Sequence, residues 1–358
     1  MTIGTSAQTY DIYISDAGNF NNPPWQIVKF DQNGENPEVF IDQELAWPQD
    51  ILFIEDQGIV LISNLSNGKI SRYDAETGDY IDDFATGING PTRMKVGSDG
   101  LLYVLQWSGT SPVLRYQLDG TYVDEYTDAG VNQSIGIDWD AEGSLYISSY
   151  GGGKVQEFDG SGIDQGAFIS SNLAGPTNVW FQDSGDLMVV DYNGGTVDHF
   201  DGDGNYIGPF MTGLSQPEGV AFLPNGDILI GNGGNGSVKR FDSDGIFIED
   251  IIPAGSGNLL TPNAVVLREN ALGLGESITS AEEVLVNSVG RVFTIMSELV
   301  EQLDSIEVLD TSGRSVYRSN ITDEVVWKAA SVSKGIYTLI LFKEGEAIHS
   351  QKILVEDK

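Results

Sequence analysis

Short stretches of alternating hydrophobic and polar residues fill the first 270 residues, and turns rich in Gly, Asp and Asn separate them. In each unit of this pattern one stretch ends in a charged residue or His, followed by an aromatic residue and then Asp or Gln. Successive aromatics are 43, 43, 42, 42 and 41 residues apart. They are Phe30, Tyr73, Tyr116, Phe158, Phe200 and Phe241. Self-similarity at a fixed period of this length predicts a repeat architecture.

A second marker keeps step with the first. A proline opens one stretch in five units, Ser134 takes its place in another, and the spacings are 43, 43, 42, 41 and 45 residues. The prolines are Pro48, Pro91, Pro176, Pro217 and Pro262. Each unit holds four hydrophobic stretches joined by turns such as Asp203-Gly204, which suit tight hairpins. Four short strands per repeat predict an all-β, six-bladed β-propeller of four-stranded blades.

The two ends of the repeat complement each other. The first unit begins at Tyr10 without a first strand, whereas 261–267 has the pattern of a first strand with no successors. We therefore predict that 261–267 completes the first blade, which protects the edges that an open array would expose. The propeller then occupies 1–268, a polar linker 269–280 and a second domain 281–358.

Charge and composition narrow the classes of partner. The 358 residues include 18 Lys and Arg against 53 Asp and Glu, for a net charge of −35, and no Cys. The lack of Cys excludes disulfides, thiolate metal sites and a Cys nucleophile. The negative field disfavours nucleic acid and anionic membranes, attracts cations such as Ca²⁺ and keeps the protein soluble. No run of 18 apolar residues occurs, so we expect no membrane insertion.

The unit runs from the repeat proline through a Gly turn to Val-x-x-Phe-Asp, as in 197–201. It resembles NHL repeats and is similar to the SMP-30/gluconolactonase group of propellers. The resemblance covers residues 10–267 and implies the fold. It does not imply one activity, because such folds host many unrelated functions.

The axis of a propeller is the expected place of its function, and two sets of positions are expected to face it. One set lies one or two places after the repeat proline, and the other closes the second strand of each unit. Their side chains mostly carry oxygen, which hard cations prefer. The first set is Asp50, Arg93, Asn178, Glu218 and Asn263. The second set is Asp16, Asn64, Gln106, Ser149, Asp191 and Asn232.

The lactonase resemblance implies a catalytic divalent metal held by Glu and Asn or Asp on innermost strands. The segment 217–219, Pro-Glu-Gly, is similar to the group's Pro-Asp-Gly context, and Asn178 could stand for its Asn. No motif identifies the third ligand. The candidate ligands for Ca²⁺ or another divalent ion are Glu218, Asn178 and Asp191, with Asp16 and Asp50 as alternatives to Asp191. Arg93 departs from this pattern, because a cation in the same ring opposes a metal.

Two further propeller chemistries depend on several axial histidines, those of the amidating lyases and the streptogramin lyases. This chain has two His. His199 occupies the charged position of the third-strand motif, and His349 lies outside the propeller. We therefore do not expect either lyase activity, and we expect both side chains at the surface.

The residues after 280 contain short strands with hairpin turns, which predict a small Ig-like β-sandwich. The segments 306–310, 313–317, 334–337 and 352–355 resemble the type A C-terminal sorting domain of the type IX secretion system of Bacteroidetes. Residues 286–288, Val-Asn-Ser, stand where that family has Pro-Asn-Pro. The resemblance implies the type IX machinery as partner and a secreted or cell-surface location, with an export signal already removed. An accessory Ig-like domain is the alternative.

These observations favour a secreted or cell-surface propeller that binds a glycan, a peptide or a protein on its axial face, because no complete catalytic set is visible. The alternative is a divalent-metal-dependent hydrolase of the SMP-30/gluconolactonase type, in which the metal lowers the pKa of water. A structural role with Ca²⁺ on an acidic surface is a third hypothesis. An ion at the axis would favour the enzyme, and Arg93 reaching inward would count against it.

Overall fold

The computed structural model describes residues 10–270, 289–294, 303–310, 314–320, 326–329, 332–343 and 346–355. One compact unit is Tyr10–Arg268, and the described residues after Arg268 belong to a second unit. Most of the expected linker at 269–280, the start of the second domain up to residue 288 and the N-terminal segment 1–9 lie outside the described residues.

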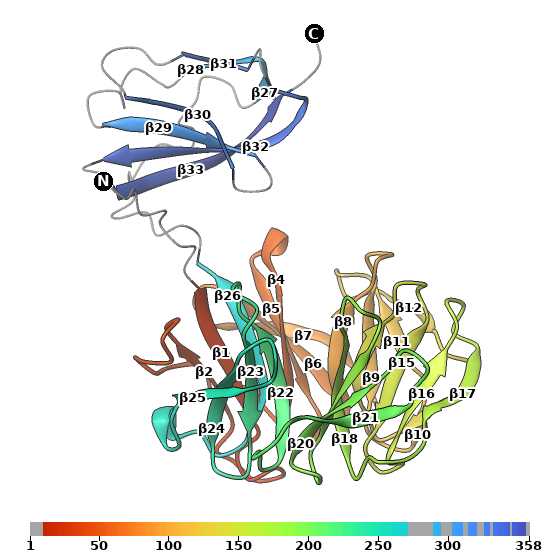
Figure 1. Ribbon diagram of the computed structural model, residues 1–358. Helices are drawn as coiled ribbons and strands as arrows, with labels where there is room; N and C mark the ends of the chain where they lie inside the picture. Colours follow the sequence, from red (N-terminus) through yellow and green to blue (C-terminus); the bar gives the residue numbers. More distant parts are fainter. Residues whose placement is uncertain are drawn as a thin grey trace. The chain divides into compact units, whose positions relative to one another are not determined.

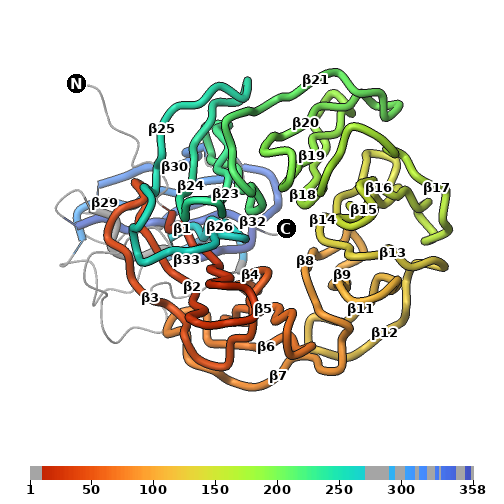
Figure 2. Tube along the Cα trace, turned by 90° about the horizontal axis from the view of Figure 1, so that it is seen from below, coloured from red at the N-terminus to blue at the C-terminus, as the bar shows by residue number. Residues whose placement is uncertain are grey.

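Six four-stranded sheets, here called blades, lie within residues 10–270. They stand around a ring, and Figure 2 looks along its axis, with β4, β8, β14 and β18 near the centre. Blade 1 contains β26 (Pro262–Glu269), β1 (Tyr10–Asp16), β2 (Gln26–Phe30) and β3 (Glu38–Ile41). Blade 2 contains β4 (Pro48–Ile54), β5 (Ile59–Asn64), β6 (Lys69–Asp74) and β7 (Tyr80–Thr86). Blade 3 contains β8 (Pro91–Val96), β9 (Leu102–Gln106), β11 (Leu114–Tyr116) and β12 (Tyr122–Glu125).

The remaining blades follow the same order along the chain (Figure 1). Blade 4 contains β14 (Ser134–Trp139), β15 (Leu145–Ser149), β16 (Lys154–Phe158) and β17 (Asp164–Ile169). Blade 5 contains β18 (Pro176–Phe181), β19 (Leu187–Asp191), β20 (Thr196–Phe200) and β21 (Tyr206–Met211). Blade 6 contains β22 (Pro217–Phe222), β23 (Ile228–Asn232), β24 (Ser237–Phe241) and β25 (Phe247–Ile252). The smaller elements are β10 (Thr110–Ser111), its partner β13 (Val131–Asn132), and the 3₁₀ turns η1 (Glu55–Gln57) and η2 (Ser256–Asn258). The predicted all-β propeller of four-stranded blades is confirmed.

The last strand of the propeller joins the first blade. β26 lies beside β1, and the carboxylate at the end of β1 holds the chain that leads into β26. The Oδ1 atom of Asp16 accepts a hydrogen bond from the N–H of Thr261 at 2.8 Å, and Oδ2 accepts one from the N–H of Leu260 at 3.1 Å. Residues 245 positions apart in the sequence therefore close the ring.

The aromatic that sets the sequence period is the packing anchor of each blade. All six copies are buried, with exposures of 6% or less. In several blades this ring packs against an aromatic of the outermost strand, as in Tyr73–Tyr80 and Phe241–Phe247, whose centroids are 5.6 and 5.7 Å apart at steep angles. Such edge-to-face contacts add to the free energy of burial, so one side chain per repeat ties the outer strand to the core.

A β-bulge follows the repeat proline in most blades. The pairing of the first strand with the second shifts between Pro48 and Asp50, and again between Pro217 and Val220. Blades 3, 4 and 5 shift at the equivalent place. A bulge breaks the strict alternation of faces, so two consecutive residues after the proline can both reach the axis.

The described residues of the C-terminal unit form two sheets around one core. The larger has the order β27-β33-β32-β29-β30, and the smaller pairs β28 with β31. Their strands are β27 (Val289–Gly290), β28 (Val292–Thr294), β29 (Ser305–Leu309), β30 (Ser315–Asn320), β31 (Val326–Lys328), β32 (Gly335–Lys343) and β33 (Glu346–Val355). Trp327 of the small sheet is buried and stacks on Phe293 at 5.3 Å, and Val308 and Leu339 of the large sheet belong to the same cluster. The two sheets form a small sandwich.

Candidate functional site

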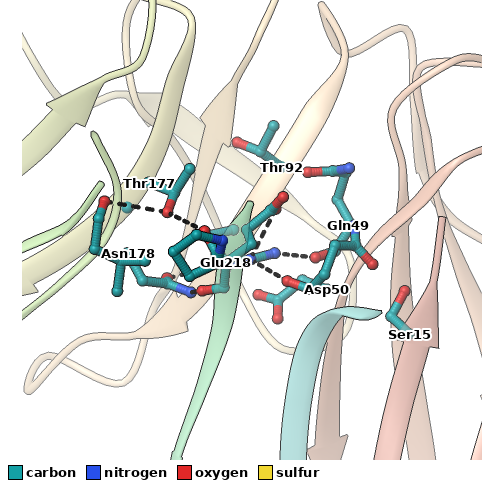
Figure 3. A network of polar contacts seen from close by, with 12 residues as sticks. Ser15, Gln49, Asp50, Thr92, Thr177, Asn178 and Glu218 are labelled. Carbon is teal, nitrogen blue, oxygen red and sulfur yellow. Dashed lines mark hydrogen bonds and ion pairs between the residues drawn. The ribbon is translucent and has the colours of Figure 1, made fainter. Parts of the chain in front are cut away.

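Arg93 on β8 reaches across the centre of the propeller. Its Nη2 atom donates to Oε1 of Glu218 at 3.1 Å and to the backbone oxygen of Asn263 at 2.5 Å. Its Nε atom donates to Oδ1 of Asn178 at 3.2 Å, and Nη1 donates to the backbone oxygen of Gln49. One guanidinium from blade 3 thus binds residues of blades 1, 2, 5 and 6. Figure 3 shows Gln49, Asn178 and Glu218 converging on this point.

Two carboxyl groups are buried beside this guanidinium. Glu218 is 7% exposed and Asp50 is 8% exposed. Burial raises the pKa of Glu218 to about 7, although the adjacent Arg93 acts in the opposite direction. Burial also raises the pKa of Asp50 against the attraction of Arg93, and Oδ2 of Asp50 accepts the N–H of Met94 at 2.8 Å. The axis is therefore closed by a buried polar cluster rather than by hydrophobic packing.

The first predicted set is gathered at this cluster. Arg93, Asn178, Glu218 and the backbone of Asn263 are in direct contact, and Nδ2 of Asn178 also donates to the backbone oxygen of Glu218 at 2.6 Å. Asp50 lies close enough for Arg93 to influence its pKa. The bulge after each proline explains why Asp50 and Asn178, two places after it, share the axis with Glu218, one place after it.

The second predicted set has a different role, because its side chains form hydrogen bonds with the backbone of neighbouring loops. The carboxylate of Asp191 accepts three N–H groups, from Ala174 at 2.7 Å, Gly175 at 2.8 Å and Gly194 at 3.1 Å. Asn232 accepts the N–H of Ser215 at 2.6 Å. In three other blades, Asp16 accepts the N–H of Thr261, Asn64 accepts that of Ala46, and Gln106 accepts that of Asn89. Each side chain closes the second strand of a blade and fastens the loop that enters the first strand. We call this set the loop clasps.

Hydroxyl groups link neighbouring blades around the axis, a feature that the sequence reasoning missed. Ser15 donates to the oxygen of Pro48 at 3.1 Å, and Ser63 donates to the oxygen of Thr92 at 2.6 Å. Blade 3 has Leu105 at the position of these serines, and there Thr92 donates to the oxygen of Ser134 at 2.8 Å. Where the second strand carries an aliphatic residue, the first strand thus supplies the hydroxyl that links the two blades.

A cavity of about 350 Å³ opens beside the polar cluster. Its walls are aromatic and its remaining lining is largely polar. The aromatic lining residues are Phe20, Trp47, Trp107, Tyr150 and Tyr192. The polar lining residues include Gln49, Thr177, Asn193, Gln216 and Glu218. Burial and the nearby Glu218 carboxylate raise the pKa of the Tyr192 hydroxyl, which places these two groups within electrostatic reach. We call this space the axial cavity.

A smaller cavity of about 170 Å³ lies further along the same innermost strands. Arg93 and Asn178 line it, together with residues nearer the ends of β8, β18 and β22, such as Lys95, Trp180 and Phe222. The amino group of Lys95 binds Oδ1 of Asp138 at 2.5 Å. The guanidinium of Arg93 therefore separates two spaces along one axis.

The predicted metal site does not fit this arrangement. The positively charged Arg93 contacts both Glu218 and Asn178, where a divalent ion would have to bind. Both oxygens of Asp191 already accept backbone N–H groups. Within the described residues, no group of three Asp, Glu or His side chains is placed to hold a metal ion. This geometry does not favour Glu218, Asn178 and Asp191 as ligands of Ca²⁺ or another divalent metal, and that site stays a prediction.

The histidine expected at the surface of the propeller lies on β20. The Nε2 atom of His199 is 2.8 Å from Oδ2 of Asp186, and both side chains are about a quarter exposed. His199 lies on the third strand of blade 5 and Asp186 in the turn before the second, so the pair takes no part in the axial cluster.

Comparisons with known proteins agree with the two units. Residues 214–241 match the family model described as the NHL repeat, and residues 287–356 match the secretion system C-terminal sorting domain. No curated protein sequence matches the chain. No helix of the described residues is long and apolar enough to cross a membrane.

Solved structures share the fold at low identity. A chain of a nidogen/laminin complex aligns with a TM-score of 0.58 and 15% identity, covering 72% of this chain and 98% of its own. A protein of unknown function from Bacteroides caccae aligns with a TM-score of 0.57 and 14% identity over the same shares. A putative gluconolactonase aligns with a TM-score of 0.50 and 14% identity, covering 88% of this chain and 92% of its own. At such identities the likeness establishes the fold alone.

Proposed function

We propose that this chain, a β-propeller with an NHL repeat and a C-terminal secretion sorting domain, acts at the cell surface by binding a ligand in its axial cavity. The sorting domain indicates secretion to the cell surface and implies an interaction with the type IX secretion machinery. The propeller is then the part that works outside the cell.

The axial cavity carries the binding part of the proposal. Concave sites with apolar walls and a few convergent polar groups are the usual form of a small-ligand site. Here five aromatic side chains surround Gln49 and Glu218, which are 2% and 7% exposed. At about 350 Å³ the cavity suits a small molecule or the end of a longer chain rather than a folded protein.

The hydrolase alternative has less support. The metal-dependent mechanism needs a divalent ion next to Glu218, and the Arg93 guanidinium lies there instead. Arg93 also donates hydrogen bonds to Asn178 and to two backbone oxygens. If the guanidinium moved away to make room for a metal ion, these buried acceptors would lose their donor. A buried and fully engaged cation makes this axis a poor metal site, which favours binding over metal-assisted hydrolysis.

Export is tested by removing residues 281–358 in the native host and measuring the protein outside the cell. We expect the truncated chain to be retained inside, because the sorting domain is the part that the secretion machinery reads. Its control is a full-length chain with Ile207→Ser, a substitution at an exposed position of β21 in the propeller. Unchanged secretion of the truncated chain would refute the export part of the proposal.

Binding is tested with the exported protein and a panel of small neutral, acidic and cationic compounds and short peptides. A compound that binds the axial cavity should change tryptophan emission and raise the unfolding temperature. Trp107→Ala, which removes one aromatic wall, should abolish both effects, whereas Tyr122→Ala, at an exposed position of β12 outside the cavity, should not. If Trp107→Ala left every observed response intact, or no compound gave one, the binding proposal would fail.

A further inference from the structure

We infer that the axial cavity binds an uncharged pyranose sugar, as a free sugar or at the end of a glycan. The inference rests on the proposed binding function and names its ligand class. It is carried by the hydrogen-bonding groups that the fold leaves unpaired inside the cavity, together with the aromatic walls around them.

Two residues that line the cavity each carry a buried polar atom that has no hydrogen-bond partner in the part of the chain that the structure describes. One is the donor Nε1 of Trp47, and the other is the acceptor Oε1 of Gln49. An unpaired buried polar group costs about 1–3 kcal/mol, so native proteins rarely keep one without a partner. A ligand that satisfies both must accept one hydrogen bond and donate another.

Glu218 adds a second acceptor in the same space. Arg93 contacts Oε1 of Glu218, which leaves Oε2 as a further acceptor on a side chain that lines the cavity. Hydroxyl groups both donate and accept, so a ligand with several hydroxyls can satisfy Trp47, Gln49 and Glu218 together. A sugar ring carries such hydroxyls around its edge and presents C–H groups on its faces.

The aromatic walls suit those faces. Phe20 and Trp47 form one pair, with centroids 5.3 Å apart. Trp107, Tyr150 and Tyr192 form a continuous row on the other blades, with centroid distances of 5.4 and 5.9 Å. Aromatic faces carry partial negative charge and attract the weakly positive C–H groups of a ring that lies over them. The row comes from blades 3, 4 and 5, where an aromatic residue directly follows each loop clasp.

The backbone at the cavity is held in an unfavourable conformation. Trp47 and Gln216, each directly before the first strand of its blade, have φ angles of 54° and 51°. Gly90 stands at the equivalent place in blade 3 with a φ of 71°. A residue other than Gly in this conformation costs about 1–2 kcal/mol, and such strain concentrates at ligand sites. Gln133 of blade 4 has the same conformation, with a φ of 50°, and does not line the cavity, whereas in blades 2 and 6 the strained residue is also a lining residue.

Charge selects among sugars and against other small ligands. The chain has a net charge of −35, and Glu218 lines the cavity, so uronic acids, sulfated sugars and phosphates are disfavoured. A quaternary ammonium ion suits aromatic walls and the negative field. However, the ammonium group has no atom that accepts the N–H of Trp47, and choline adds only a single hydroxyl to it. The unpaired donor therefore favours a neutral hydroxylated ring over a cation.

The experiment measures binding of methyl glycosides of glucose, galactose, mannose and N-acetylglucosamine to the full chain by calorimetry. Glucuronic acid, choline and a short neutral peptide are the comparison probes. We expect at least one neutral glycoside to bind. Trp47→Phe keeps the ring and removes the N–H, so it should weaken that glycoside about tenfold. Gln49→Leu should weaken it similarly, whereas Gln43→Leu, at an exposed position outside the cavity, should not.

The outcomes separate the ligand class from the binding function. If choline or the peptide binds, loses its binding in Trp107→Ala, and no glycoside binds, the sugar inference is overturned and the cavity remains a binding site. If a glycoside binds and neither Trp47→Phe nor Gln49→Leu weakens it, the sugar inference is likewise overturned. If no probe binds, both the inference and the binding function fail. Near-ultraviolet circular dichroism of each variant shows whether its propeller is folded.

Discussion

Replacing Arg93 by Met tests whether the axial cluster holds the ring together. The substitution removes the positive charge beside Glu218 and leaves the backbone oxygens of Gln49 and Asn263 without their donor. Breaking a buried ion pair by removing one partner destabilises a protein by about 3–5 kcal/mol, because the other charge stays buried. We expect Arg93→Met to lower the free energy of unfolding of the propeller by that amount at pH 8.

The loss should depend on pH, and the dependence identifies its cause. The pKa of Glu218 is about 7, so at pH 5 its carboxyl is protonated in the folded protein and needs no cation. Removing Arg93 raises this pKa further, which adds up to about 1.4 kcal/mol to the loss at pH 8, where the carboxyl must then take up a proton, and adds almost nothing at pH 5. The variant should therefore be closer to wild type at pH 5.

The assay is urea unfolding followed by tryptophan emission, since five of the six tryptophans lie before residue 269. Arg72→Met is the matched control, because Arg72 pairs with the half-exposed Asp82 on an outer strand and such pairs contribute about 0–1 kcal/mol. Adding Glu218→Gln to Arg93→Met should restore about 2 kcal/mol. Equal losses for Arg93→Met and Arg72→Met, or a double variant no more stable than the single one, would refute the reasoning.

Two further predictions concern the loop clasps and the pH dependence of the wild-type protein. Asp191→Ala leaves three N–H groups without an acceptor and should lower the free energy of unfolding by about 3 kcal/mol or more in the same urea assay. Asp191→Asn introduces the residue type found at Asn64 and Asn232, which keeps one acceptor oxygen. It should therefore lower the free energy of unfolding by less than half as much. Because the folded-state pKa of Glu218 lies above its unfolded value of 4.5, its contribution is favourable at low pH and about 3 kcal/mol is lost as the pH rises from about 4.5 to about 7. Glu218→Gln should flatten the measured stability over that window, and an unchanged slope would show that burial does not perturb this carboxyl.

The sequence predicted the repeat because a buried aromatic such as Phe158 has one packing role in each blade, and that role permits little variation. The direction of side chains near the axis was harder to predict. Asp191 and Asp50 are both acidic residues at strand ends, yet one binds loop backbone and the other lies beside Arg93. The bulge after the repeat proline decides which residues reach the axis, and the proline marks its place without showing how the following side chains turn.

The axial cavity was missed for a related reason. Trp107, Tyr150 and Tyr192 each follow a strand-closing residue and read as ordinary hydrophobic positions in a single repeat. Their signal appears only when three successive repeats are aligned at that position. The left-handed backbone of Trp47 could not be predicted from the sequence. Glycine is the usual sign of this conformation, as at Gly90 in blade 3, and position 47 has a tryptophan instead.

The pairing of β26 with β1 has a consequence for how the chain matures. Blade 1 stays incomplete until the ribosome has made residue 269, so the seven residues of β1 must wait for a strand synthesised about 250 residues later. Contacts of such long sequence separation slow folding. The nascent propeller therefore keeps an unpaired edge through most of its synthesis, and the sorting domain that follows emerges only after the last strand needed for closure. A chain that carries the sorting domain therefore already contains every strand that the ring needs to close.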